Sequence, residues 1–210
     1  MSSFSEEQWI NWVDQLAKDD YVVIDSFLND EMFNMIRSYF LARLATDGFS
    51  DAAIGALNEK QLKKSIRGDK IYWLERKVDL EMSSFFNLTD ELTQKLNELC
   101  YLSLSGAEFH LAHYPEGTFY KKHIDQFKGR NNRLISVIIY LNVGWLQGDG
   151  GELKIYRPDG NDLFVAPLAG RCVMFKSETV PHEVLKTEVS RYSLTGWLLY
   201  QPSTLGYLLG

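Results

Sequence analysis

The sequence predicts an α+β fold in which helices precede an antiparallel β-sandwich or roll. In the first half, apolar residues recur at helical spacing behind capping signals. From about residue 104 the apolar period changes to alternation, and glycines and prolines then separate short strands with no helix-length spacer between them. Such a run of short strands and turns favours an antiparallel arrangement over a parallel α/β sheet.

The first predicted helix begins with a capping box. Ser5 is followed at the third position by Gln8, and Trp9, Val13 and Leu16 then fall at helical spacing. A compact β-rich run, Tyr21–Ile24, follows and predicts one short strand.

Two more helices are expected in the first half. Asn29 or Asp30 can cap the second, which ends before Gly48. Thr89 is expected to cap the third. The inner faces of these two helices are formed by Phe33, Ile36, Phe40 and Leu44, and by Leu92, Leu96 and Leu99.

The remaining strands are expected after Leu104. There Phe109, Leu111 and His113 point to one side of a strand, with their neighbours pointing to the other. Further predicted strands span 133–142, 152–156, 162–165, 171–176 and 192–200. The 210 residues fit one domain, 1–210, with helical support over 1–103 and a β core over 104–202.

Composition narrows the classes of function. A formal charge of -6 opposes attraction to phosphate backbones, so we expect no nucleic-acid partner. Cys100 and Cys172 stand far apart and are expected to be free, buried thiols. The start of the chain has no signal-peptide pattern, and nowhere do about 18 uncharged apolar residues follow one another. We therefore expect a cytoplasmic protein with no membrane partner; its oligomeric state stays open.

Three residues are the expected metal ligands. His123 and Asp125 stand at i and i+2, a spacing that puts two side chains on one face of a strand. His182 follows a strand and a proline turn, where an adjacent strand can bring it alongside. Two imidazoles and one carboxylate on one face of an ion leave coordination positions open, as in iron(II) oxygenases.

Arg191 strengthens this interpretation. It stands nine residues after His182, on the next predicted strand. A fixed guanidinium there could bind the far carboxylate of a dicarboxylate cosubstrate in a bidentate manner.

With these residues, 113–201 resembles the double-stranded β-helix (jelly-roll) core of the prolyl hydroxylases. The run 66–73 (IRGDKIYW) is similar to the loop and strand of the oxygen-sensing prolyl hydroxylases that act on hypoxia-inducible factor, and of their bacterial relatives. The resemblance implies N-terminal helices packed on one sheet of the jelly roll, and a substrate loop near 66–85.

The resemblance also implies the remaining site residues. Tyr114, Tyr140 and Arg191 match the family's residues that hold 2-oxoglutarate. Tyr120 and Trp197 match the aromatic wall for the target proline, and Arg133 stands where the family binds the peptide backbone. Further substrate contacts are expected on the closing loop, from Arg67, Asp69 and Lys70. His110 and His113 have no counterpart that we identify, so we expect them to be structural or exposed.

The implied activity is hydroxylation of a prolyl residue in a protein, with Fe(II) as metal and 2-oxoglutarate and O2 as cosubstrates, and with ascorbate as a further possible cofactor. Elongation factor Tu is the target implied by the bacterial relatives. Two alternatives stay open. One keeps the oxygenase chemistry but acts on a free amino acid, a small metabolite or an alkylated base, the last disfavoured because Trp197 stands where repair demethylases carry a second arginine. The other is a non-catalytic, metal-binding β-roll module.

Overall fold

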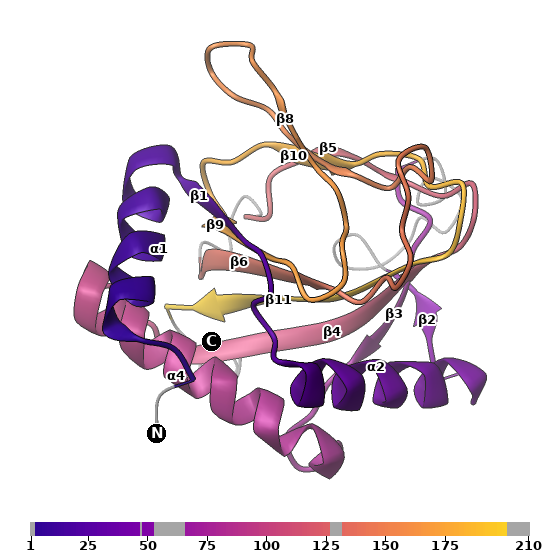
Figure 1. Cartoon of the computed structure of the whole chain (residues 1–210), viewed down its shortest axis with the longest axis horizontal. Coiled ribbons are helices and arrows are strands. Elements are labelled where there is room, and N and C mark those ends of the chain that lie inside the picture. The colour runs from indigo at the N-terminus through magenta and orange to yellow at the C-terminus, as the bar shows by residue number, and fades with distance from the viewer. Residues whose placement is uncertain (1–2, 47, 53–65, 127–131, 201–210) are drawn as a thin grey trace, which may run out of the picture.

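The structure, a computed structural model, describes residues 3–46, 48–52, 66–126 and 132–200. It confirms the predicted α+β fold with a jelly-roll core: two antiparallel sheets face each other, and helices cover the outer face of the larger one (Figure 1). The larger sheet has seven strands in the order β1-β9-β6-β11-β4-β3-β2, and the smaller has four in the order β5-β10-β7-β8. All pairings between these strands are antiparallel.

The strands of the larger sheet are β1 (Tyr21–Ile24), β2 (Ser50–Asp51), β3 (Lys70–Trp73), β4 (Gly106–Tyr114), β6 (Arg133–Tyr140), β9 (Cys172–Lys176) and β11 (Arg191–Leu199). Those of the smaller sheet are β5 (Tyr120–His123), β7 (Leu153–Ile155), β8 (Leu163–Val165) and β10 (His182–Val184). The predicted strands are confirmed to within a few residues. Three were not predicted as strands, namely β2, β5 and β10, and the last two carry two of the expected metal ligands.

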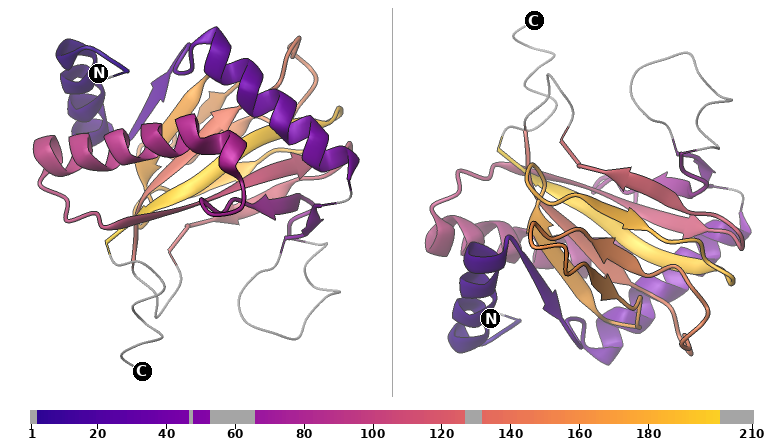
Figure 2. Two further views of the ribbon diagram at one scale, coloured as in Figure 1. Left: turned by 90° about the horizontal axis from the view of Figure 1, so that it is seen from below. Right: turned by 90° about the horizontal axis from the view of Figure 1, so that it is seen from above.

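The helices form a layer of their own. They are α1 (Glu6–Asp19), α2 (Asp30–Ala45), the short 3-10 helix η1 (Leu80–Met82) and α4 (Ser83–Cys100). Figure 2 shows α2 and α4 lying across the larger sheet on the face away from the smaller one. Within the described residues, no helix combines the length with the apolar composition that crossing a bilayer requires.

The helix starts show where local signals decide the fold and where they do not. The capping box of Ser5 and Gln8 is present, and the Asn29 side chain caps α2 by accepting from the Met32 N–H. The prediction that Thr89 caps the third helix is wrong. Since η1 runs directly into α4 at Ser83, Thr89 lies inside the helix, where its hydroxyl donates to the Phe86 carbonyl.

Two apolar cores lie on the two faces of the larger sheet. One lies between this sheet and the helices, with Trp9, Ile36, Phe40, Leu92 and Leu111 among its buried members. The other lies between the two sheets and includes Ala112, Tyr140, Leu153, Phe175 and Val184. Because side chains alternate along a strand, β4, β6 and β9 supply both cores. Tyr114, Tyr140 and Arg191, which are expected to hold the cosubstrate, lie on the side of the larger sheet that faces the second core.

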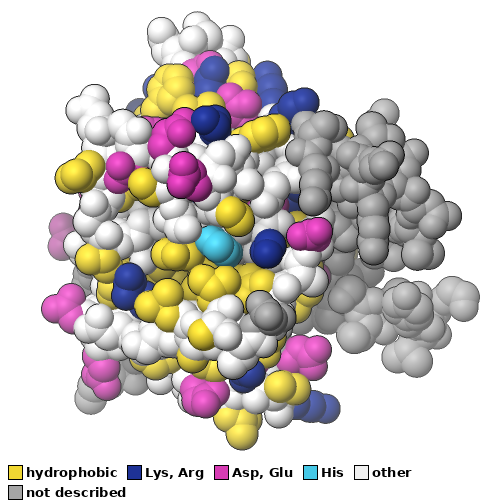
Figure 3. Space-filling model, turned by 90° about the vertical axis from the view of Figure 1, so that its right-hand side faces the viewer, with side chains coloured by type: hydrophobic (Ala, Val, Ile, Leu, Met, Phe, Trp, Pro, Cys, Tyr) yellow, Lys and Arg dark blue, Asp and Glu magenta, His cyan; other side chains and the backbone are white. Residues whose placement is uncertain are grey.

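One face of the molecule carries hydrophobic, acidic and basic side chains close together. The face on the right of Figure 1, drawn in Figure 3, shows hydrophobic side chains gathered around a histidine, with acidic and basic side chains around them. Neither sign of charge dominates the part of that face that the structure describes.

Candidate active site

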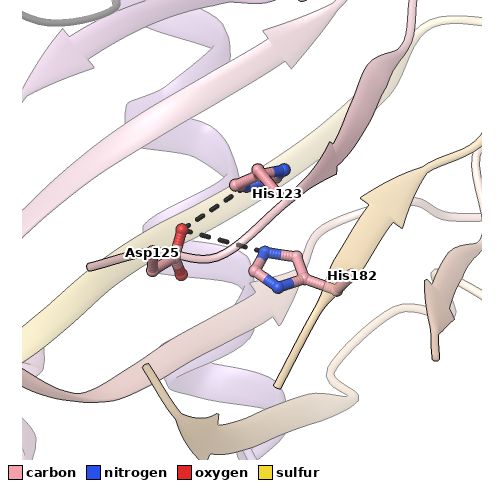
Figure 4. Close-up of side chains that lie close together, drawn as sticks. All are labelled: His123, Asp125 and His182. Carbon is pink, nitrogen blue, oxygen red and sulfur yellow. Dashed lines mark ion pairs between the residues drawn. The ribbon is translucent and has the colours of Figure 1, made fainter. Parts of the chain in front are cut away.

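Pairing of β5 with β10 brings the expected metal ligands together. His182 lies directly opposite His123 in the register of this pair, and Asp125 follows two residues after the end of β5. One potential ligand atom from each of the three side chains lies within 4.8 Å of the others. Figure 4 shows the three side chains pointing toward one another, His123 from β5, Asp125 from the segment after β5 and His182 from β10.

The distances within the triad suit one ion. Asp125 Oδ1 lies 3.4 Å from His123 Nε2 and 3.8 Å from His182 Nε2 (Figure 4). With metal-ligand bonds of about 2.0–2.2 Å, two ligand atoms of one ion lie about 3 to 4 Å apart. The three side chains therefore need little movement to share an ion.

Hydrogen bonds determine which ring nitrogen of each histidine is free to bind a metal ion. His123 Nδ1 lies 2.8 Å from the Lys121 carbonyl, and His182 Nδ1 lies 3.0 Å from the Val180 carbonyl. Because a carbonyl can only accept, each Nδ1 carries the proton, and each Nε2 keeps a free lone pair facing Asp125. This is the tautomer that an Nε2-bound metal requires.

Asp125 is held ionised and oriented. Its burial would raise the pKa of the carboxyl, but the neighbouring His182 and His123 and the Ser136 hydroxyl bring that pKa well below its usual range. Ser136 Oγ donates to Asp125 Oδ2 at 2.6 Å, and Ser177 Oγ lies 2.8 Å from Ser136 Oγ. Oδ1 therefore stays available for the ion.

The environment keeps His182 neutral. Burial lowers its pKa to about 4, although the Asp125 carboxylate opposes that shift. The side chain of His182 is 4% exposed and that of His123 is 18% exposed. The triad is thus closed on the side of β10 and more open on the side of β5.

A second polar group, centred on Arg191, packs against rings of the core between the sheets. Arg191 stands directly opposite Tyr114 in the β4–β11 register, and two residues on, Ser193 stands opposite Tyr140 of β6. The Arg191 guanidinium carbon lies 4.8 Å from the ring centre of Tyr114 and 5.1 Å from that of Tyr140. Arg191 and both tyrosines are buried.

This arginine lacks a protein counter-ion. Its Nε donates to the Gly151 carbonyl at 2.8 Å, and Nη1 lies 3.5 Å from Ser193 Oγ. Among the described residues, Arg191 Nη2 and the Tyr140 hydroxyl have no hydrogen-bond partner, and no carboxylate forms an ion pair with Arg191. An unpaired buried charge is costly, so this group fits an anionic ligand such as the far carboxylate of 2-oxoglutarate.

The expected substrate residues fall into two groups. In the first, Arg67 donates to Asp69, and its guanidinium carbon lies 4.3 Å from the ring centre of Tyr120. Tyr120 in turn stacks on His123. The segment before β3 is held there by hydrogen bonds from Gly68 N–H to the Phe119 carbonyl and from Lys121 N–H to the Ile66 carbonyl.

The second group surrounds Trp197. The Arg133 guanidinium carbon lies 3.4 Å from the Trp197 ring centre, and Arg133 Nη2 pairs with Glu108 at 2.7 Å. His110, Trp197 and Trp73 form a cluster of three rings: the His110 ring centre lies 5.4 Å from that of Trp197 and 4.9 Å from that of Trp73, and the two tryptophan ring centres lie 6.3 Å apart. Trp73 is 43% exposed, so an aromatic surface reaches solvent beside Trp197.

Several site residues were missed by sequence reasoning. Ser136 and Gly151 carry no local signal for their contacts with Asp125 and Arg191. Glu108 lies on a predicted strand, but its contact with Arg133 depends on the order of strands in the sheet, which was not predicted. His110 is buried, which agrees with the expectation of a structural histidine. His113 lies over the Tyr192 ring, with ring centres 5.2 Å apart.

Comparisons with known proteins agree with this geometry. The family model described as "2OG-Fe(II) oxygenase superfamily" matches residues 109–199. Rat Egl nine homolog 1 is 33% identical over 193 residues, which cover 87% of this chain and 56% of that protein. The chain thus spans about half the length of that curated relative.

Solved structures extend the similarity over nearly the whole chain. A Pseudomonas putida prolyl-4-hydroxylase superposes with a TM-score of 0.84 at 32% identity, covering 92% of this chain and all (100%) of that one. A Trichoplax adhaerens prolyl hydroxylase, solved with a peptide of the hypoxia-inducible factor oxygen degradation domain, has a TM-score of 0.83 at 24% identity, covering 99% of this chain and 98% of that one. The second likeness supports the fold alone.

Proposed function

This chain belongs to the 2OG-Fe(II) oxygenase superfamily as a relative of the prolyl hydroxylases, and from that premise we propose that it hydroxylates a prolyl residue of a protein substrate. The single observation that carries the proposal is the pair of buried polar groups between the sheets. A His-Asp-His triad is gathered at the smaller sheet, and a buried arginine on the larger sheet, among the described residues, lacks a protein counter-ion. This is the arrangement that a ferrous ion and a dicarboxylate cosubstrate need.

The metal and the cosubstrate have separate sites. His123, Asp125 and His182 would hold Fe(II), the metal typical of this family, through two Nε2 atoms and Oδ1. Arg191 and the Tyr140 hydroxyl would bind the far carboxylate of 2-oxoglutarate, with Tyr114 alongside. When bound, Fe(II) supplies the redox chemistry that couples decarboxylation of 2-oxoglutarate to hydroxylation of a C–H bond.

The chain's own residues then position the substrate and exclude water. Tyr120 and Trp197 would contact the prolyl ring. Tyr120 stacks on His123, and Trp197 packs against Arg133, whose Nη1 donates to the Asp125 carbonyl at 3.4 Å. The guanidinium groups of Arg67 and Arg133 are held by Asp69 and Glu108, which fixes them beside the Tyr120 and Trp197 rings. There they would bind the peptide backbone next to the target residue.

The class of substrate that we propose is inferred from proteins similar to this chain. The Pseudomonas putida relative is named a prolyl-4-hydroxylase. A protein segment that presents a proline is therefore the substrate we propose. The first specific target to test is elongation factor Tu.

Mass spectrometry tests this proposal. Iron-loaded protein, 2-oxoglutarate and O2 are incubated with a cell lysate, and separately with purified elongation factor Tu, and peptides are searched for a gain of one oxygen on proline. We expect prolyl oxidation that disappears with His182→Ala. Oxygen found only on free amino acids would favour the metabolite alternative. Metal binding without decarboxylation of 2-oxoglutarate to succinate would favour the non-catalytic module.

A further inference from the structure

The turn at Gly150 and Gly151 lies against Arg191, although 40 residues separate Gly151 from Arg191 along the chain. Both glycines have positive φ, +70° and +74°. The Gly151 carbonyl accepts the hydrogen bond from Arg191 Nε at 2.8 Å. One carbonyl of this turn is therefore the main hydrogen-bond acceptor of the buried guanidinium.

The contact leaves no room for a side chain. A Cβ on Gly151 would lie 2.8 Å from Arg191 Cδ and 3.0 Å from Thr187 Oγ1. Arg191 and Thr187 are both buried, at 2% and 0% exposed. The arginine could make room only by moving its guanidinium, since Thr187 is held by a hydrogen bond from its hydroxyl to the Val189 carbonyl at 2.7 Å.

The turn itself is fixed in place. The Gly151 N–H donates to the Lys186 carbonyl at 3.1 Å, and the Leu185 N–H donates to the Glu152 carbonyl at 3.0 Å. On its other side, Trp145 Nε1 donates to the Gly150 carbonyl at 3.0 Å. The position of the Gly151 carbonyl is thus set by the fold before any ligand binds.

We propose that Gly151 is a positioning residue for 2-oxoglutarate, acting through Arg191. Its carbonyl holds Nε, and the missing Cβ lets Cδ approach, so that the guanidinium is held near the Tyr140 ring with Nη2 left unpartnered for a ligand. A planar guanidinium binds a carboxylate well only in the right orientation. The inference rests on the proposed function, because it concerns the same cosubstrate.

A matched pair of glycine substitutions tests the proposal. Gly151→Ala adds a Cβ against Arg191, whereas Gly160→Ala adds one at a similar φ of +78° with nothing within 4 Å. Both substitutions strain a left-handed backbone, but only the first crowds the arginine. The dissociation constant of 2-oxoglutarate is measured by calorimetry on the Mn(II)-loaded protein, with the melting temperature recorded for each variant.

We expect Gly151→Ala to weaken 2-oxoglutarate binding at least about tenfold, roughly the loss of one charge-assisted hydrogen bond. Gly160→Ala should bind as the unsubstituted protein does, and the Mn(II) affinity of both variants should stay unchanged. Equal 2-oxoglutarate affinity in the two variants would overturn the proposal. If the unsubstituted protein bound Mn(II) but no 2-oxoglutarate, the proposed function would fail together with it.

A second measurement needs no substitution at Gly151 and covers the case in which that variant does not fold. The Arg191 Nε–H signal is assigned in nitrogen-15 NMR spectra by its loss in Arg191→Lys. We expect it to be protected from solvent exchange both before and after 2-oxoglutarate binds. Rapid exchange in the bound state would show that the Gly151 carbonyl does not hold the guanidinium there, and would overturn the proposal.

Discussion

Tyr120 stacks on His123, with ring centres 3.6 Å apart and ring planes inclined by only 16°. The Tyr120 ring also contacts Arg67, whose guanidinium carbon lies 4.3 Å from the Tyr120 ring centre. A partly exposed metal ligand is thereby held by a neighbouring ring as well as by the Lys121 carbonyl. The stack connects the segment expected to close over the substrate with the metal centre.

Removal of the Tyr120 ring should weaken metal binding. We expect Tyr120→Ala to lower Mn(II) affinity about 10- to 100-fold, as loss of an outer partner of a ligand typically does. Tyr120→Phe keeps the stacked ring and should keep the affinity. Calorimetric titration of Mn(II) into the three proteins measures the effect. Unchanged affinity in Tyr120→Ala would show that the stack does not orient His123.

Arg191→Lys should weaken the binding of 2-oxoglutarate and leave metal binding unchanged. Lysine keeps the charge but cannot bond in a bidentate manner, so we expect the dissociation constant of 2-oxoglutarate to rise at least about tenfold. The control is Arg171→Lys, because Arg171 pairs with the exposed Asp25 on the surface. Equal binding of 2-oxoglutarate by both variants would contradict the assigned role of Arg191.

His110 should make the fold sensitive to acid. Burial lowers its pKa to about 3, with Asp69 opposing that shift and Arg67 and Arg133 adding to it. The unfolded chain therefore takes up a proton near pH 6.5, whereas the folded chain does so only near pH 3. Stability from this group is complete above pH 6.5 and falls as the pH drops toward 3, by up to about 1.4 kcal/mol per pH unit.

The measurement is urea unfolding at pH 7 and pH 4.5 for the unsubstituted protein and His110→Leu. The variant should lose less stability between the two pH values, since leucine takes up no proton. The metal ligands titrate in both proteins, so their contribution cancels in the comparison. Equal losses of stability in the two proteins would mean that His110 is already protonated in the folded protein at pH 4.5.

Asp79 should stabilise the helix layer. This buried carboxylate accepts hydrogen bonds from the hydroxyls of Tyr39 on α2 and Tyr72 on β3 and from the Glu75 N–H. We expect Asp79→Ala to cost about 3 kcal/mol of unfolding free energy, because it leaves buried donors unpaired. Asp90→Ala removes a partner of Arg76 from an exposed pair and should change little. Urea midpoints compare the two variants, and similar shifts would argue against the buried network.

The sequence predicted the fold well wherever the signal was local. The Ser5 capping box and the strand at Tyr21–Ile24 lie where expected, because neighbouring residues determine them. Thr89 failed as a cap because the incoming 3-10 helix, which a cap signal does not reveal, begins the helix six residues earlier. The short strands β5 and β10 escaped prediction because three or four residues carry no clear period.

The three metal ligands could be predicted from the sequence, whereas the contacts that place them could not. The spacing of His123 and Asp125 indicated two ligands, but the placement of His182 opposite His123 depends on strand pairing across 59 residues. The stack of Tyr120 on His123, the Ser136 bond to Asp125 and the Gly151 bond to Arg191 are likewise long-range or rotamer-dependent. No local pattern encodes such contacts.

Anaerobic titration with Fe(II) tests the central claim most directly, namely that His123, Asp125 and His182 hold one ion. Metal bound per chain is measured for the unsubstituted protein and for His182→Ala at equal concentration. The account predicts one equivalent of Fe(II) for the first and a loss of stoichiometric binding for the second. The same stoichiometry in both proteins, or no Fe(II) bound by either, would contradict it.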